Sequence, residues 1–289
     1  MGPNAYRYEG FVAKLQRAGL DITDAGNVFC DERYKVAQGD NPKLHYLNEI
    51  VRISNDTAQT VHSAVGNGRK VIVLGGDHTT CLGAVSGASA AVNGDIGLIY
   101  FDAHGDMNTH ETTLTGNIHG MQLASLMGFG ASELCQVHAN TVKVQPANVL
   151  HIGGSDWDKA ELDLVRTKKI PTYTMQDILT TSLGALLPMI KDLQSRVKYI
   201  WVSLDLDAID AQYAPAAGMP NQRGLLYREI KMLAEYIGAH CNVLGVDVVE
   251  YNPLEDTAHK TALLATELVA NFFNKQFSWY TDYLSRNPQ

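Results

Sequence analysis

The stretch that decides the fold is residues 96–120, IGLIYFDAHGDMNTHETTLTGNIHG. It begins with an unbroken apolar run, Ile96–Tyr100, which is typical of a buried strand in a parallel sheet. Asp102, His104 and Asp106 then follow at every second position, and an extended backbone points alternate side chains the same way. We therefore predict that these three side chains face one point beyond the carboxyl end of the strand, where open α/β sheets place their sites.

Length and composition narrow the class of protein. The chain has 289 residues, 45% of them hydrophobic, a formal net charge of −8 and a pI of about 5.6. This acidic balance argues against a nucleic-acid partner. No apolar run reaches transmembrane length and no signal pattern opens the chain, so we expect a soluble, cytoplasmic protein without a membrane partner. The four scattered cysteines form no CxxC pair and are expected to be reduced thiols: Cys30, Cys81, Cys135 and Cys241.

Strand and helix patterns alternate along the chain, which predicts a three-layer αβα fold with a central, mostly parallel sheet. We interpret residues 1–289 as a single domain. Strands are expected at Asp21–Val28, Val71–Leu74, Ile96–Phe101, Val149–Ile152, Tyr199–Leu204 and Val243–Val249. Helices are expected at Tyr8–Ala18, Tyr46–Gly66, Thr79–Ala91, His119–Met127, Ala160–Thr167, Ser182–Val197, Tyr227–Gly238 and Thr257–Phe273, and a loop at Asp31–Lys43.

Hard metal ligands follow four of the predicted strands. They are His78, then Asp102, His104 and Asp106, then Asp205, Asp207 and Asp210, and finally Asp247 and Glu250. Carboxylates that lie this close together repel one another and raise each other's pKa values, and a divalent cation removes the conflict. Carboxylate and imidazole ligands without thiolate favour Mn²⁺ over Zn²⁺. Two bridging carboxylates and two imidazoles suffice for a pair of ions.

Each motif also has an ordinary structural interpretation. An Asp at a strand end often caps the next helix. His119 could be an exposed loop histidine, and Asn108 and Asn117 could be turn residues that bond to their own backbone. Three such motifs, each directly after its own strand, favour a metal site over coincidence.

Taken together, these motifs resemble those of the ureohydrolase family, which includes arginase and agmatinase, over about Met1 to Phe273. The resemblance implies an arginase/deacetylase-like sheet and two Mn²⁺ ions per chain. One ion would be bound by His78, Asp102, Asp106 and Asp205, and the other by Asp102, His104, Asp205 and Asp207. Asp102 and Asp205, together with a hydroxide, would bridge the two ions.

The substrate loop is most similar to that of the arginases, which implies hydrolysis of L-arginine to L-ornithine and urea. Asn108, Thr115 and Asn117 match the residues that hold the substrate's α-carboxylate. In the acidic cluster that includes Asp156, the resemblance assigns Asp158 and Glu161 to the α-amino group. It assigns Glu250 to the guanidinium, and His119 to proton transfer. Asp106 can also accept or relay a proton.

Two departures leave alternatives open. Family members usually have an apolar strand before the MGP with which this chain begins. Its absence would leave a gap inside the sheet and unpaired backbone groups unless the chain is truncated or a neighbouring strand closes the gap, and we expect lower stability. Ala217 and Met219 stand where arginases have Thr, which could change the substrate range. Agmatinase, guanidinobutyrase, formiminoglutamase or a non-catalytic binding protein therefore remain alternatives. The family resemblance also implies a homo-oligomer, a trimer or a hexamer.

Overall fold

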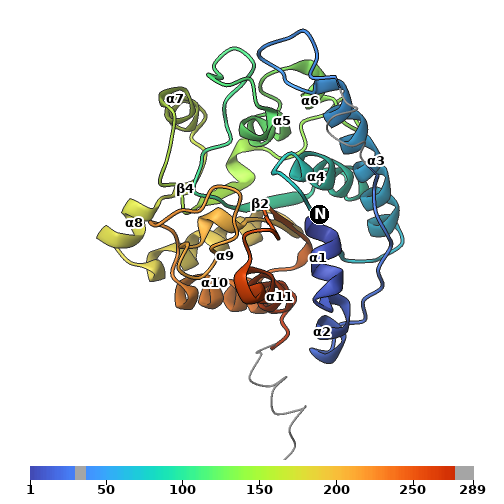
Figure 1. Ribbon diagram of the computed structural model, residues 1–289. Coiled ribbons are helices and arrows are strands. Elements are labelled where there is room, and N and C mark those ends of the chain that lie inside the picture. The colour runs from blue at the N-terminus through green and yellow to red at the C-terminus, as the bar shows by residue number, and fades with distance from the viewer. Residues whose placement is uncertain (30–36, 277–289) are drawn as a thin grey trace, which may run out of the picture.

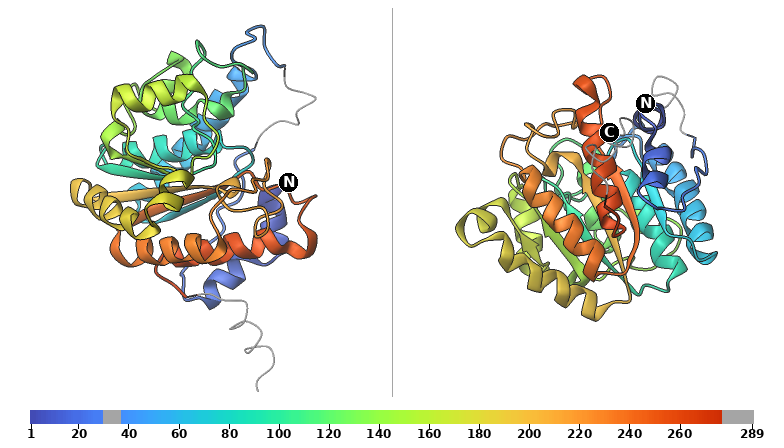
Figure 2. Two further views of the ribbon diagram at one scale, coloured as in Figure 1. Left: turned by 90° about the vertical axis from the view of Figure 1, so that its left-hand side faces the viewer. Right: turned by 90° about the horizontal axis from the view of Figure 1, so that it is seen from below.

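The computed structural model describes residues 1–29 and 37–276 (Figure 1). Within these residues six strands form one all-parallel sheet in the order β1-β6-β5-β2-β3-β4. The strands are Val71–Leu74 (β1), Ile96–Phe101 (β2), Val149–Ile152 (β3), Thr172–Tyr173 (β4), Tyr199–Asp205 (β5) and Val243–Val249 (β6). Helices cover both faces of the sheet (Figure 2), which confirms the predicted three-layer αβα fold.

The sheet is apolar because its central strands are covered on both sides. Every residue of β2, β3 and β6 is buried, whereas β1, at one edge, is half-buried throughout. One face packs against α3 (Leu47–Gly66), α4 (Thr80–Ala91) and α5 (Gln122–Leu126). The other packs against α2 (Phe11–Arg17), α9 (Leu186–Arg196), α10 (Tyr227–His240) and α11 (Lys260–Phe272). Strands buried in this way are continuous hydrophobic runs, which is why the sequence reveals them.

Helix α4 lies unusually close to α3, and two glycines permit it. A Cβ atom on Gly83 would lie 2.6 Å from the carbonyl oxygen of Ser54, and one on Gly87 would lie 2.2 Å from that of Ala58. Any larger residue would push the helices apart. This close packing holds the first turn of α4, and the segment Gly75–Thr79 before it, against the end of the sheet.

The N-terminal third differs from the prediction. The helix expected at Tyr8–Ala18 is found as α2 (Phe11–Arg17) with a later start, because Gly10 takes a left-handed φ of 72° before it, and a further helix, α1 (Gly2–Tyr8), was not predicted. The strand expected at Asp21–Val28 is wrong, since this segment is irregular. Among the described strands there is no gap, as expected if a neighbouring strand closes it: β1 is hydrogen-bonded directly to β6, and the six described strands are consecutive neighbours.

Elsewhere the predicted elements are found with small changes at their ends. The helices expected at His119–Met127, Ser182–Val197 and Thr257–Phe273 each begin with a 3₁₀ turn, at Ile118–Gly120, Leu183–Ala185 and Thr257–His259. Helix α7 (Lys159–Lys168) was predicted. Strand β4 and helices α6 (Ser132–Cys135) and α8 (Met175–Thr180) were not predicted. In the expected loop, residues 31–36 lie outside the described residues. Across the described chain, no helix is both long and apolar enough to span a membrane.

Candidate metal centre

The order of the strands brings the predicted ligands together. Strands β1, β6, β5 and β2 are neighbours in the sheet, and their carboxyl ends lie along one edge. His78 follows β1, Asp102 to Asp106 follow β2, Asp205 ends β5 and Glu250 follows β6. Segments that are more than 150 residues apart in the sequence therefore supply one site.

The first cluster is built around His78. Its Nδ1 atom lies 2.9 Å from Asp102 Oδ2, 3.0 Å from Asp205 Oδ2 and 3.2 Å from Asp106 Oδ2. One ring nitrogen carries at most one proton, so it cannot donate to all three oxygens. Indeed, Asp102 Oδ2 is buried without a hydrogen-bond partner among the described residues. Ligands at right angles around a cation, with bonds of about 2.1 Å, lie about 3 Å apart, so these four residues fit one ion.

The second cluster is built around His104 and shares Asp102 with the first. The Nδ1 atom of His104 lies 3.1 Å from Asp207 Oδ2 and 3.3 Å from Asp102 Oδ1. Asp102 thus turns one oxygen to each histidine. Backbone N–H groups hold the other carboxylate oxygens: Asp207 N donates to Asp205 Oδ1 and Ala103 N donates to Asp207 Oδ1. Two adjoining clusters joined by one carboxylate have the arrangement that a pair of cations requires.

The charges of this centre are in conflict without a cation. Burial, followed by repulsion from Asp106 and Asp207, raises the pKa of Asp102 to about 8. Burial and repulsion from Asp207 and Asp102 likewise raise the pKa of Asp205 well above its ordinary value. Hydrogen bonds to Asp102 and Asp207 raise the pKa of His104 to about 12. A divalent cation would replace the imidazole protons and balance the carboxylates together.

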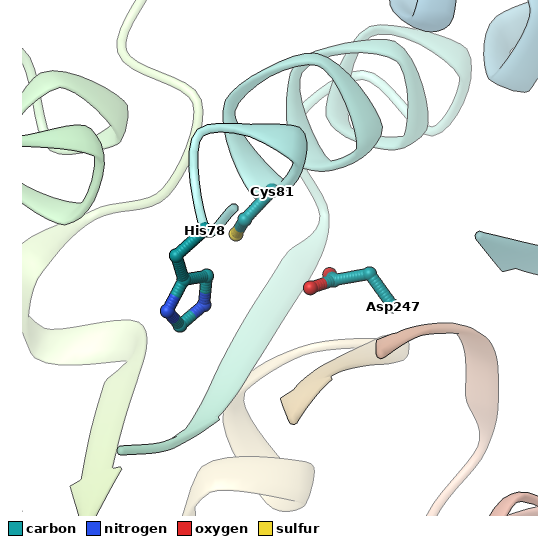
Figure 3. Close-up of side chains that lie close together, drawn as sticks. All are labelled: His78, Cys81 and Asp247. Atoms are coloured by element: carbon teal, nitrogen blue, oxygen red, sulfur yellow. The ribbon is translucent and has the colours of Figure 1, made fainter. Parts of the chain in front are cut away.

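The edge of the His78 ring that carries Nε2 faces a different set of groups (Figure 3). His78 Nε2 lies 2.9 Å from Ser203 Oγ, and Ser203 donates in turn to Asp247 Oδ1 at 2.7 Å. Cys81 lies beside them, and burial and then the Asp247 carboxylate raise the pKa of its thiol to about 12. Although His78, Cys81 and Asp247 are close enough to hold a metal ion, this imidazole edge faces away from the carboxylate clusters. We interpret the chain of Ser203 and Asp247 as the support that orients His78 as a ligand.

Glu250 and His119 lie beside the first cluster. Glu250 Oε1 accepts a hydrogen bond from the backbone N–H of His78 at 2.9 Å, and His119 Nδ1 is 3.9 Å from the same oxygen. Burial, and then repulsion from Asp77, raise the pKa of Glu250. Glu250 and Asp106 both have left-handed φ angles, of 61° and 53°. Such strain in non-glycine residues is typical of functional sites, where the surrounding structure imposes it.

The predicted substrate residues lie in two segments, the loop that follows Asp106 and the start of α7. Asn108 Nδ2 donates to Asp158 Oδ2 at 2.8 Å, so the two sides of the expected amino-acid site are in contact. Glu161 is 5% exposed and its two oxygens accept from the backbone N–H groups of Met107 and Asp158. Thr115 and Asn117 lie on the same loop, where Thr115 Oγ1 accepts from the Asn117 N–H.

Several residues of the centre were missed from the sequence. Tyr100 and Gln122 are fully buried and bond to Asp106, and the buried His151 bonds through Nε2 to the carbonyl oxygen of His104 at 2.6 Å. Tyr100 and Ser203 stand two residues before Asp102 and Asp205, on the same face of their strands. The alternation that revealed the ligands could therefore have revealed these two as well.

Comparisons with known proteins agree with this geometry. The family model described as the Arginase family matches residues 1–274. The chain is 34% identical to an arginase of Bacillus caldovelox over 277 residues, which cover 96% of this chain and 92% of that protein. It is 36% identical to an arginase of Staphylococcus aureus, covering 95% and 91%. The solved structure of the Bacillus caldovelox arginase matches with a TM-score of 0.91, covering 96% and 93%.

The chain belongs to the arginase family. Membership confirms the family, the fold and the class of enzyme that the sequence predicted, a metal-dependent hydrolase of the arginase type. Within the described residues, the arginase-type ligands converge in two groups, His78 with Asp102 and Asp106, and Asp102 with His104 and Asp207.

Proposed function

We propose that this protein is a dimanganese arginase, one αβα domain that hydrolyses the guanidinium group of L-arginine to L-ornithine and urea. The observation that carries the proposal is the position of Asp102, whose two oxygens face two different histidines, each with further carboxylates. The donors are hard oxygens and imidazoles, which suit Mn²⁺. His78, Asp102, Asp106 and Asp205 would hold one ion, and Asp102, His104, Asp205 and Asp207 the other.

A pair of cations held by these residues would lower the pKa of a bound water molecule and so supply a nucleophile near neutral pH. Glu250 binds and orients the substrate guanidinium, because its carboxylate carries the opposite charge and is fixed by the His78 N–H at 2.9 Å. The backbone gives it room: a Cβ on Gly218 would lie 2.3 Å from Glu250 Oε2. The residues that hold the guanidinium and those that hold the cations are thus rigidly linked through His78.

Protons move through the residues around this pair. Asp106 accepts a proton from the attacking water and relays it toward the leaving nitrogen as the substrate carbon–nitrogen bond breaks. His119, whose side chain is 41% exposed, stands between Glu250 and solvent and protonates the departing amine or returns a proton to water.

The far end of the substrate is an amino acid, which needs partners for both an ammonium and a carboxylate. Asp158 and Glu161 are proposed to bind the α-amino group, and Asn108, Thr115 and Asn117 the α-carboxylate. The contact between Asn108 and Asp158 places an amide donor and a carboxylate side by side, as such a group requires. Agmatine has no α-carboxylate and would leave the amide and hydroxyl donors of this loop unused.

Urea release tests the proposal. The protein is loaded with Mn²⁺ and assayed for urea with L-arginine, and in parallel with agmatine and guanidinobutyrate for urea and with formiminoglutamate for formamide. Urea from L-arginine alone is the expected result. Turnover of another of these substrates would overturn the assignment of the loop but keep the metal centre. Metal binding without turnover of any substrate would indicate a binding protein of this fold.

We also propose that the protein works in the cytoplasm as a homo-oligomer, a trimer or a hexamer, as its resemblance to arginases implies. Light scattering of the Mn²⁺-loaded protein tests the assembly, and a monomer would contradict it.

A further inference from the structure

Two buried polar side chains converge on Asp106, and the proposed function gives neither a role. The Tyr100 hydroxyl donates to Asp106 Oδ2 at 2.7 Å, and the Gln122 amide donates to the same oxygen. Gln122 also donates to the Tyr100 oxygen at 2.9 Å, and both residues are 0% exposed. The backbone N–H of Met121 donates to Gln122 Oε1 at 3.2 Å, which fixes the amide with its NH₂ group toward Asp106.

Tyr100 does not compete with a cation for His78. The two rings are stacked, with centroids 4.6 Å apart and planes at 3° to each other, and the hydroxyl oxygen lies 3.1 Å from His78 Nδ1. Because the rings are parallel, the hydroxyl lies outside the plane of the imidazole, whereas the Nδ1 lone pair lies within it. The lone pair therefore remains available for a metal ion, and the hydroxyl proton goes to Asp106.

Asp106 is a residue that needs such support. Its φ of 53° is unfavourable for a residue with a side chain, and its carbonyl oxygen is used to accept the Leu123 N–H of α5 at 3.1 Å. A buried hydroxyl and a buried amide are themselves costly unless they are hydrogen-bonded. Apolar side chains could fill the same volume, so this polar pair has its explanation in the bonds that it makes to Asp106.

We infer that Tyr100 and Gln122 are positioning residues for the first cation: together they hold the Asp106 carboxylate against His78 in the geometry that the ion requires. The inference rests on the proposed metal centre but not on the identity of the substrate. Replacing a residue that is hydrogen-bonded to a metal ligand typically changes metal affinity 10- to 100-fold.

The test uses Tyr100→Phe, which keeps the stacked ring, and Gln122→Met, which keeps the approximate volume. Tyr6→Phe is the matched control, because Tyr6 is also 0% exposed and its hydroxyl has no hydrogen-bond partner among the described residues. Each protein is equilibrated in chelator-buffered Mn²⁺, the bound ions are counted by atomic absorption, and electron paramagnetic resonance distinguishes a coupled pair from a single ion. The unfolding midpoint of each metal-free protein is measured as well.

The wild type and Tyr6→Phe should bind two ions and show the spectrum of a coupled pair. Tyr100→Phe and Gln122→Met should bind one of the two ions roughly 10- to 100-fold more weakly and show an isolated ion at limiting Mn²⁺, with metal-free midpoints close to that of the control. Wild-type affinity at both sites would overturn the inference. So would a metal-free midpoint far below that of Tyr6→Phe with both affinities reduced, since that result indicates a packing role.

The inference and the proposed function can fail separately. If the wild type binds two ions and hydrolyses none of the four substrates, the proposed function fails, and the measured metal affinities alone decide the positioning roles. If the wild type binds no Mn²⁺, both are overturned.

Discussion

Asp102→Asn removes the carboxylate that joins the two clusters and is expected to have opposite effects with and without metal. Burial, then repulsion from Asp106 and Asp207, raises the pKa of Asp102 from 3.8 to about 8. Because the folded-state pKa is the higher one, the folded protein holds this proton more tightly than the unfolded chain. The stability of the metal-free wild type should therefore fall as pH rises from about 4 to 8 and change no further above that range on account of this group.

The size of the effect follows from the same shift. Ionising a carboxyl group whose pKa has been raised from 3.8 to about 8 costs the folded state at most about 6 kcal/mol. Asn keeps the shape of Asp and carries no charge. Metal-free Asp102→Asn should therefore equal the wild type near pH 4 and exceed it by several kcal/mol at pH 9.

Mn²⁺ should remove this advantage. An ion present at 100 times its Kd stabilises the wild type by about 2.7 kcal/mol for each site. Asp102→Asn loses one ligand from each cluster, so it should gain little. Urea unfolding at pH 5 and pH 9, with chelator and with Mn²⁺, gives the four free energies of unfolding for each protein. If Asp102→Asn is less stable than the wild type at pH 9 without metal, and Mn²⁺ leaves that difference unchanged, the reasoning is refuted.

Three further predictions concern the substrate side of the centre. Because Glu250 is proposed to bind the guanidinium and is outside both clusters, Glu250→Gln should lower kcat/KM for L-arginine roughly 100-fold or more while two Mn²⁺ ions still bind; kinetics and metal analysis measure this. Glu161, whose pKa is raised by burial to about 7, should destabilise the protein as pH rises from 4.5 to 7, so Glu161→Gln should gain stability relative to the wild type over that range in urea unfolding. Met219→Thr, at a side chain that is 57% exposed beside Gly218, should raise kcat/KM about fivefold by restoring a hydroxyl, worth about 1 kcal/mol.

Each has a result that would count against it. An unchanged kcat/KM in Glu250→Gln, or a loss of bound Mn²⁺ that accounts for its inactivity, contradicts the role of Glu250. If the stability difference between Glu161→Gln and the wild type does not vary with pH, the pKa of Glu161 is not raised in the folded protein. Equal or lower activity of Met219→Thr would mean that the thioether does not replace a substrate contact.

The N-terminal region shows where reasoning from the sequence failed. The apolar spacing over Tyr8–Ala18 predicts a helix, but Gly10 adopts a φ of 72°, so the helix starts only at Phe11 and a separate helix precedes it. Within the described residues no strand pairs with Asp21–Val28; instead Arg7 forms an ion pair with Asp24 at 2.6 Å. Strand β4 has two residues, too few to show any period. These features depend on contacts with distant residues, which a local pattern does not contain.

The sequence by itself determined the five longer strands, the αβα class and the ligand types, because a buried parallel strand is a local apolar run and alternate positions at its end share a face. Only the tertiary structure decided which oxygen of Asp102 faces His78 and which faces His104, since that depends on the packing order of β1, β6, β5 and β2. It also decided that Tyr100 and Gln122 form hydrogen bonds with the ligand Asp106, and Ser203 with the ligand His78. A hydrogen bond between buried groups requires distances correct to a few tenths of an ångström, and these are set by the packed core as a whole.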